Sequence, residues 1–150
     1  FDLSQPVFVE AESRKIGRIS LPTSLIERMR ASPCLEIAAP AEARQAFLLR
    51  DYAYLGDDPA LLARRIDPLR PLLGNEAIDR WQKWALAGEL PPLFDELARL
   101  HYDPQYARSQ SQHFHHWPQR QTVPGDTLDE AGIDALAAAV LAVEVNDDVR

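Results

Sequence analysis

The order of secondary-structure signals in the first 55 residues is the feature that most constrains the fold. Residues 6–10, PVFVE, form a continuous apolar run that is typical of a central strand. A predicted helix over 22–31 follows, then a second strand that starts at Cys34, then a long helix over 40–55. Strands that alternate with helices predict an α/β fold with a parallel sheet.

Two strands are too few for a sheet of ordinary size. The chain starts at Phe1 rather than at a methionine, and a predicted strand follows at once. We therefore expect the chain to be a fragment, whose remaining strands precede Phe1.

Helical patterns dominate after Gly56. Helices are predicted over 59–66, 76–87 and 91–101, the second with the apolar stripe Ile78, Trp81 and Ala85. Residues 102–126 show no clear period, and the dipeptide Asp103-Pro104 predicts a turn. An amphipathic helix is predicted over 128–144. The expected organisation is an α/β section over 1–55, a helical section over 56–112 that forms a lid or an RNA-facing wall, and a loop with a last helix over 113–150.

Composition excludes some classes of protein. The formal net charge is −7 and the pI about 5.0, which argues against a chain that binds nucleic acid over its whole surface but allows a local basic patch. Cys34 is the single cysteine, so no internal disulfide forms, as in a reducing cytoplasm. No apolar run approaches the roughly 18 residues of a membrane span. We expect a cytoplasmic protein without a membrane partner.

Acidic residues follow the first predicted strand directly. Glu10 closes the apolar run, and Glu12 and Arg14 have the same parity, so the three side chains share one side if the strand continues. Such a strand end places a carboxylate beside a metal–phosphate group in nucleotide-binding folds, and Glu10 or Glu12 is the candidate Mg²⁺ ligand. The alternative is a strand that runs into a solvated loop. The phosphate-loop motif G-x-x-x-x-G-K-[ST] does not occur in the chain.

Other candidates are weaker. The segment HFHHW carries His113, His115 and His116, which fits a metal site, an RNA-stacking loop or, as we favour, a plain surface loop. A buried, inert thiol is favoured over a catalytic one for Cys34. Arg44 lies near a helix N-terminus, where a cation is unfavourable, so it is expected to have a phosphate or carboxylate partner. An ion pair with a neighbour such as Glu42 or Asp51 is the alternative.

Three segments together resemble bacterial tRNA 2-selenouridine synthases. They are VFVEAESRKIGRISLP, AAPAEARQAFLLRDYAYL and HYDPQYARSQ, and the resemblance covers roughly residues 5–112. It implies that the chain is the C-terminal part of a P-loop NTPase-like parallel sheet followed by a mostly helical region, without the rhodanese domain that the family carries at its N-terminus.

The resemblance also implies a function. The family replaces the sulfur of wobble 2-thiouridine in tRNA by selenium, through S-geranyl-2-thiouridine, with geranyl diphosphate and selenophosphate as co-substrates. The implied partners are tRNA, the enzyme that supplies selenophosphate, and the rhodanese and P-loop portions of the same protein. The chain would then be part of a transferase, with no catalytic residue of its own and no activity alone.

Site residues carry over only where the motifs match. The implied phosphate- or substrate-binding residues are Glu10, Glu12, Ser13, Arg14, Arg44, Tyr102, Asp103 and Tyr106, together with Gly17 of the first motif. Cys34 does not match the rhodanese cysteine. Two other classes remain open at this point: a P-loop kinase or NTPase of another specificity, and a non-catalytic RNA-binding module.

Overall fold

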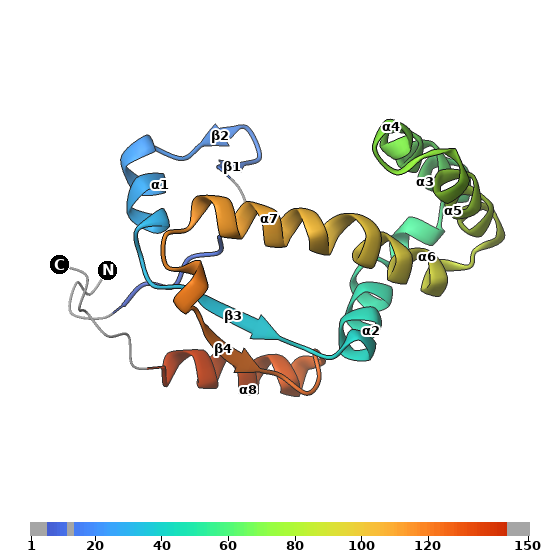
Figure 1. The fold of residues 1–150 in the computed structure, drawn as a ribbon. Helices are drawn as coiled ribbons and strands as arrows, with labels where there is room; N and C mark the ends of the chain where they lie inside the picture. The colour runs from blue at the N-terminus through green and yellow to red at the C-terminus, as the bar shows by residue number, and fades with distance from the viewer. Residues whose placement is uncertain (1–5, 12–13, 144–150) are drawn as a thin grey trace.

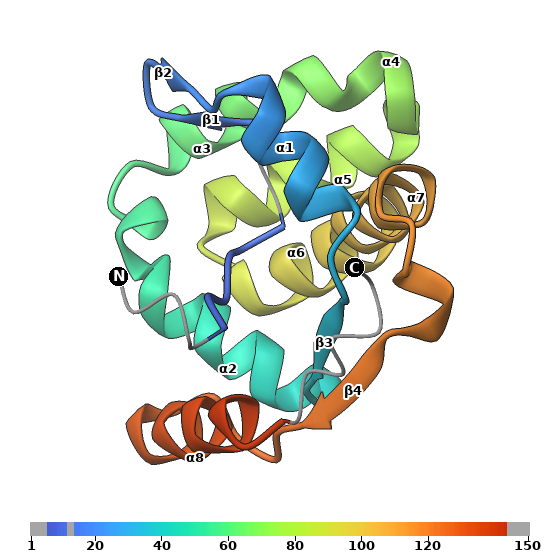
Figure 2. The same ribbon diagram turned by 90° about the vertical axis from the view of Figure 1, so that its left-hand side faces the viewer.

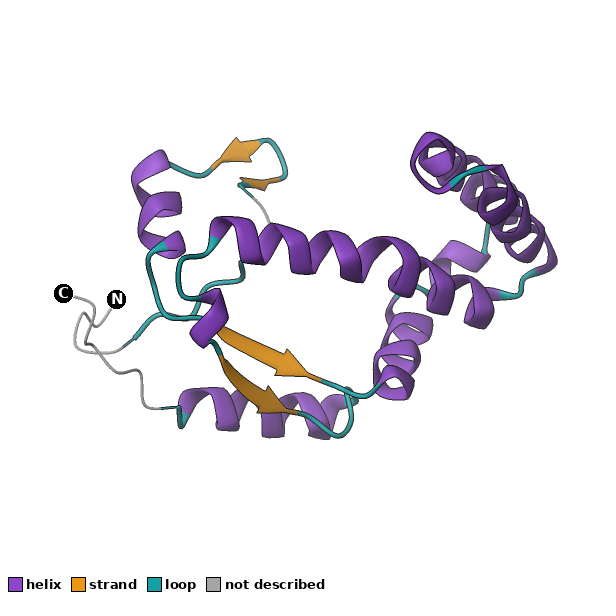
Figure 3. Cartoon of the chain, in the orientation of Figure 1, coloured by secondary structure: helices purple, strands orange, loops and turns teal. Residues whose placement is uncertain are grey.

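A computed structural model describes residues 6–11 and 14–143 (Figure 1). This part of the chain is a mixed α/β structure, mostly helical, with small sheets (Figure 3). Its helices are α1 (Thr23–Arg30), α2 (Ala41–Asp51), α3 (Pro59–Ile66), α4 (Arg70–Leu73), α5 (Asn75–Ala87), α6 (Leu90–Leu97), α7 (Asp103–His113) and α8 (Glu130–Leu141), and its strands are β1 (Lys15–Ile16), β2 (Ile19–Ser20), β3 (Leu35–Ala38) and β4 (Gln121–Pro124). The short helical turns are η1 (Ala53–Gly56), η2 (Asp67–Leu69), η4 (Trp117–Gln119) and the π-helical segment η3 (Ala98–Tyr102).

The predicted strand at Cys34 is confirmed as β3, which pairs in parallel with β4 from Leu35↔Gln121 to Ala38↔Pro124. Helix α8 packs on β4, and Val123 of the strand is buried. Strand β4 was not predicted from the sequence, because it is short, contains polar residues and ends in a proline. The α/β class is confirmed in this coarse form, while a larger P-loop-type sheet stays a prediction.

The predicted strand over 6–10 is wrong. The described residues 6–11 have no strand structure, and Val7 and Val9 are 60% and 54% exposed. An isolated extended segment becomes a strand only when a neighbouring strand accepts its hydrogen bonds. Within the described part of the chain no strand pairs with this segment. Glu10 and Arg14 therefore do not share one side of a continuous strand.

A small hairpin replaces the expected continuation of that strand. β1 and β2 pair in antiparallel fashion, and the Leu21 amide donates to the Arg14 carbonyl across 2.9 Å to close the ladder. Gly17 and Arg18 form the two-residue connection, in which Gly17 has φ +60°. Glycine at the first central position is the arrangement of a type II′ turn, whose twist suits a hairpin.

The helical core lies in α3, α5 and α6, and the helices predicted there are confirmed. Ile78, Trp81 and Leu93 are completely buried, and Leu62, Ala63, Ile66, Ala85 and Phe94 complete the cluster. Asp58 caps α3 by accepting a hydrogen bond from the Leu61 amide, and Gly88 with φ +74° ends α5. Leu100, which lies within the range predicted for the third helix, is 36% exposed.

The predicted turn at Asp103-Pro104 is also wrong. The chain continues from α6 through the π-helical segment η3 into α7, which Figure 1 shows crossing the molecule. The Asp103 amide donates to the Ala98 carbonyl five residues earlier. Pro104, which has no N–H, then falls in the first turn of α7, where the missing donor costs least. A local widening of the helix thus accommodates a proline that normally ends one.

Candidate functional site

The candidate site is built around an ion pair between Arg44 and Asp103. Arg44 lies in the first turn of α2, and Asp103 is the first residue of α7. The guanidinium donates through Nη1 to Oδ2 across 3.0 Å and through Nη2 to Oδ1 across 2.5 Å, so the contact is bidentate. This hydrogen bonding raises the pKa of Arg44 above its ordinary value, although burial opposes the shift. The predicted carboxylate partner of Arg44 is therefore Asp103, and not Glu42 or Asp51.

Two stacked tyrosines adjoin this ion pair. Tyr102 and Tyr106 are one helical turn apart, with ring centroids 6.0 Å apart and ring planes inclined by 11°. Both remain accessible, at 50% and 38% exposure. Tyr102 is close enough to Arg44 to contribute, after Asp103, to its raised pKa. The structure thus brings four of the predicted residues into one surface region, with a cation, a carboxylate and two aromatic faces.

Gln110 connects α7 to the segment before the E-S-R string. Its side chain is 1% exposed, and its Nε2 donates to the Ala11 carbonyl across 2.9 Å. The buried Oε1 has no hydrogen-bond partner among the described residues. Gln110 was not predicted as a site residue, because the sequence around it shows no clear helical period. A helix over this stretch would have shown Tyr102, Tyr106 and Gln110 at successive intervals of four residues, on one face.

The acidic segment itself is exposed. Glu10 and Arg14 are exposed, and neither forms an ion pair with another described residue; Glu12 and Ser13 lie outside the described residues. No hydrogen bond or ion pair joins Glu10 or Arg14 to the Arg44–Asp103 pair within residues 6–11 and 14–143. The same residues contain no group of three or more His, Cys, Asp or Glu side chains arranged to hold a metal ion.

Cys34 and the histidine segment are held in place by packing and hydrogen bonds to neighbouring residues. Burial raises the pKa of the Cys34 thiol, and the positive charge of Arg120 opposes this effect only in part. The raised pKa disfavours the reactive thiolate. Arg120 is held by Glu36 at 2.7 Å and stacks on Trp117 at 4.4 Å from the ring centre. The His115 amide donates to the Arg30 carbonyl across 2.9 Å, which fixes this segment beside α1.

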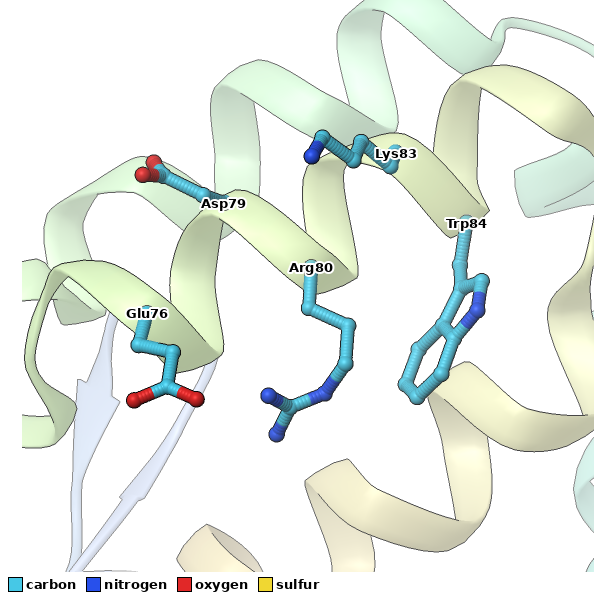
Figure 4. Close-up of a pocket in the computed structure, with 5 residues that line it drawn as sticks. All are labelled: Glu76, Asp79, Arg80, Lys83 and Trp84. Atoms are coloured by element: carbon cyan, nitrogen blue, oxygen red, sulfur yellow. The ribbon is translucent and has the colours of Figure 1, made fainter.

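A pocket on the helical part lies along α5 and not beside the motif residues. Glu76, Asp79, Arg80, Lys83 and Trp84 line it (Figure 4). Arg80 is paired with Glu96 at 2.6 Å and lies over the Trp84 ring at 5.6 Å from its centre. The most basic side chain of this pocket is thus engaged in holding α5 to α6, and the mixed charges of the lining select no ligand class.

Comparison with known proteins identifies the family that the chain resembles. Residues 2–65 match the family model described as "tRNA 2-selenouridine synthase AAA domain". The tRNA 2-selenouridine synthase of Cupriavidus pinatubonensis is 41% identical over 88 residues, which are 59% of this chain and 23% of that protein. The enzyme of the same name from Marinobacter nauticus is 38% identical over 93 residues, 52% of this chain and 24% of that protein.

These matches confirm the resemblance seen in the sequence. The chain spans about a quarter of the length of the curated relatives that it matches. No solved structure matches it significantly. Within the described residues, no helix has the length and apolar character needed to cross a membrane.

Proposed function

We propose that the chain is part of a tRNA-modifying transferase that converts wobble 2-thiouridine to 2-selenouridine through S-geranyl-2-thiouridine. The observation that carries the proposal is the meeting of the family motifs along α7. Asp103 of the Y-D-P-x-Y string holds Arg44, 59 residues away in the chain, while Gln110 of the same helix holds Ala11, 99 residues away. Segments from all three family motifs are thereby held at one helix.

In this proposal the segment contributes to the phosphate and tRNA sites. Arg44 presents a guanidinium whose geometry suits a phosphate as well as a carboxylate, so a diphosphate or selenophosphate would compete with Asp103 for it. Arg14 supplies a second cation. Tyr102 and Tyr106 offer accessible ring faces to the substrate, either to a base or to an apolar chain.

Mg²⁺ fits the proposal through Glu10 or Glu12. Mg²⁺ is commonly held by one or two carboxylates together with substrate phosphates and water, so a complete cage of protein ligands is not required. The exposed carboxylate of Glu10 has the right donor atoms for this role. When bound, the ion would neutralise charge on the phosphate groups, while Arg14 and Arg44 orient them.

The remaining parts of the reaction are assigned outside this chain. Its one cysteine, Cys34, is a partly buried thiol with a raised pKa, which makes a poor nucleophile. The phosphate loop and the rhodanese cysteine would come from other portions of the same protein, and selenophosphate from a separate enzyme. The 150-residue chain is therefore expected to be inactive alone.

Steady-state kinetics of the full-length protein that contains this chain test the proposal. With thiolated tRNA and geranyl diphosphate, Arg14→Ala and Arg44→Ala should each raise the KM for geranyl diphosphate by about tenfold, because one charge-assisted contact to phosphate is lost. Arg50→Ala is the matched control: Arg50 lies on the same helix and pairs with Asp51 at 2.9 Å. The KM of Arg50→Ala for geranyl diphosphate should stay within about twofold of the value for the unsubstituted protein.

Two results would contradict the proposal. Unchanged KM values in both Arg14→Ala and Arg44→Ala would remove these residues from the phosphate site. Phosphate transfer to a small molecule, without geranylation of tRNA, would instead place the protein among kinases or NTPases of another specificity.

A further inference from the structure

Basic residues are concentrated in one short stretch of an otherwise acidic chain. Residues 14–30 hold five of the sixteen basic residues and one of the twenty-three acidic residues, Glu27. The stretch thus carries a net charge of +4, although the whole chain carries −7. It forms the β1–β2 hairpin and α1, which lie together at one end of the molecule (Figures 1 and 2).

Unlike most arginines elsewhere in the described part of the chain, those of this stretch have no acidic partner; Arg64, Arg65 and Arg108 also form no ion pair with another described residue. Arg44, Arg50, Arg70, Arg80, Arg99 and Arg120 each form an ion pair. Arg18, Arg28 and Arg30 form none with any other described residue. Arg18 and Arg28 are exposed, and Arg30 is half-buried. Their charges are therefore available to an external anion.

The fold places these cations on two different elements. The positive φ of Gly17 turns the chain back and places Arg18 at the hairpin tip. Arg28 and Arg30 occupy the last turn of α1, where a cation also favours the helix dipole. That effect explains α1 alone, because a hairpin tip has no such dipole. A common anionic partner accounts for all three positions.

We propose that the β1–β2 hairpin and α1 form a docking surface for the phosphate backbone of RNA. The inference rests on the proposed function, which supplies RNA as the polyanion. Charge complementarity supports it: phosphates are repelled by the acidic remainder of the chain and attracted to this surface. Arginine forks match phosphate oxygens, so several spaced guanidinium groups can follow an RNA strand. The surface positions tRNA and does not read its sequence.

Equilibrium binding of labelled tRNA to the full-length protein, over a series of salt concentrations, tests this surface. The triple variant Arg18→Ala/Arg28→Ala/Arg30→Ala should bind tRNA at least about tenfold more weakly. The slope of the logarithm of the binding constant against the logarithm of the salt concentration should become shallower by about 2 to 3. The reason is that each lost phosphate contact reduces this slope by about 0.7–0.9. None of these three arginines belongs to the buried core, so their substitution by alanine leaves that core intact.

The matched control is Arg64→Ala/Arg65→Ala/Lys83→Ala. These residues are exposed on α3 and α5, and the variant removes the same net charge at the other end of the molecule. Unchanged tRNA affinity in the control, with the loss confined to the first variant, supports the docking surface. Equal losses in both variants, or none in the first, overturn it, as does binding of anionic phospholipid vesicles with an affinity equal to that for tRNA.

The kinetic readout separates this inference from the proposed function. The triple variant should raise the KM for tRNA and leave the KM for geranyl diphosphate unchanged, opposite to Arg44→Ala. If the protein fails to geranylate tRNA at all, the proposed function fails, and the binding series still decides whether the hairpin and α1 hold RNA.

Discussion

At the scale of single residues, Glu96 supplies the hydrogen-bond acceptor for the polar groups of Trp81 and Arg80 at the helical core. Its Oε2 accepts hydrogen bonds from the Trp81 indole Nε1 at 2.8 Å and from Arg80 at 2.6 and 3.1 Å. Trp81 is completely buried, so water cannot replace this acceptor. Burial acts to raise the pKa of Glu96, but the hydrogen bonds from Arg80 and Trp81 outweigh it and hold the pKa below its ordinary value.

The substitution Glu96→Leu leaves the Trp81 N–H buried and unpaired. It should lower the free energy of unfolding by about 1–3 kcal/mol. Glu96→Gln keeps a carbonyl acceptor and should lose less. Urea unfolding followed by tryptophan fluorescence measures both. A Glu96→Leu variant as stable as the original chain would contradict the role given to this carboxylate.

The same lowered pKa sets a pH dependence. Because the folded-state pKa lies below the unfolded value, the contribution of Glu96 is complete above the unfolded pKa and is lost as the pH falls through the folded pKa. The stability difference between the original chain and Glu96→Gln should therefore shrink on acidification below the ordinary pKa of 4.5.

At the scale of elements, the N-terminus of α8 depends on a glycine inside the helix. Asp129 caps the helix by accepting from the Gly132 amide at 2.8 Å, and the Thr127 hydroxyl donates to the same carboxylate at 3.1 Å. A Cβ on Gly132 would overlap the backbone carbonyl of Thr127. The turn before α8 therefore closes only over a residue without a side chain.

We predict that Gly132→Ala destabilises the docking of α8 on β4. Helix propensity alone predicts that Gly132→Ala raises the free energy of unfolding by roughly 1 kcal/mol. The sign of the measured stability change therefore distinguishes propensity from the steric contact with Thr127. Ala131→Ser, which adds an atom at the neighbouring exposed position, serves as the control. The protection of α8 amides against hydrogen exchange and the thermal midpoint should both fall in Gly132→Ala and stay unchanged in Ala131→Ser. A raised midpoint would show that propensity outweighs the steric contact.

At the scale of the whole molecule, burial is unevenly distributed. The connected core belongs to α3, α5 and α6, whereas the part that contains the hairpin, the β3–β4 pair and α8 buries only single residues such as Ile26, Val123 and Leu136. Helix α7 spans the distance between these parts (Figure 1). Local stability follows the density of buried apolar contacts, so the two parts should open with different free energies.

Hydrogen exchange of the intact chain checks this expectation. Amides of α5, which carries Ile78, Trp81 and Ala85, should exchange most slowly, and those of the β1–β2 hairpin, where Ile16 and Ile19 are 68% and 70% exposed, most rapidly. Uniform protection along the chain would contradict the uneven core.

The sequence alone determined those elements whose signals are local. The bounds predicted for α3 agree with Pro59–Ile66, because an aspartate cap and a first-turn proline mark its start. The stripe of Ile78, Trp81 and Ala85 likewise identified the buried face of α5. Strand β3 was predicted from a short apolar run. The resemblance to tRNA 2-selenouridine synthases was also identified from the sequence, without a structure.

Only the tertiary structure decided which distant segments meet. A strand exists when another strand accepts its hydrogen bonds, so residues 6–10 fail to form one while Gln121–Pro124, with a weaker pattern, pairs with β3. Asp103-Pro104 continues a helix: the Asp103 amide bonds to the Ala98 carbonyl in η3, and Pro104, which lacks an N–H, falls in the first turn of α7. The contacts of Arg44 with Asp103 and of Gln110 with Ala11 depend on packing across the chain, and no local propensity encodes such distances.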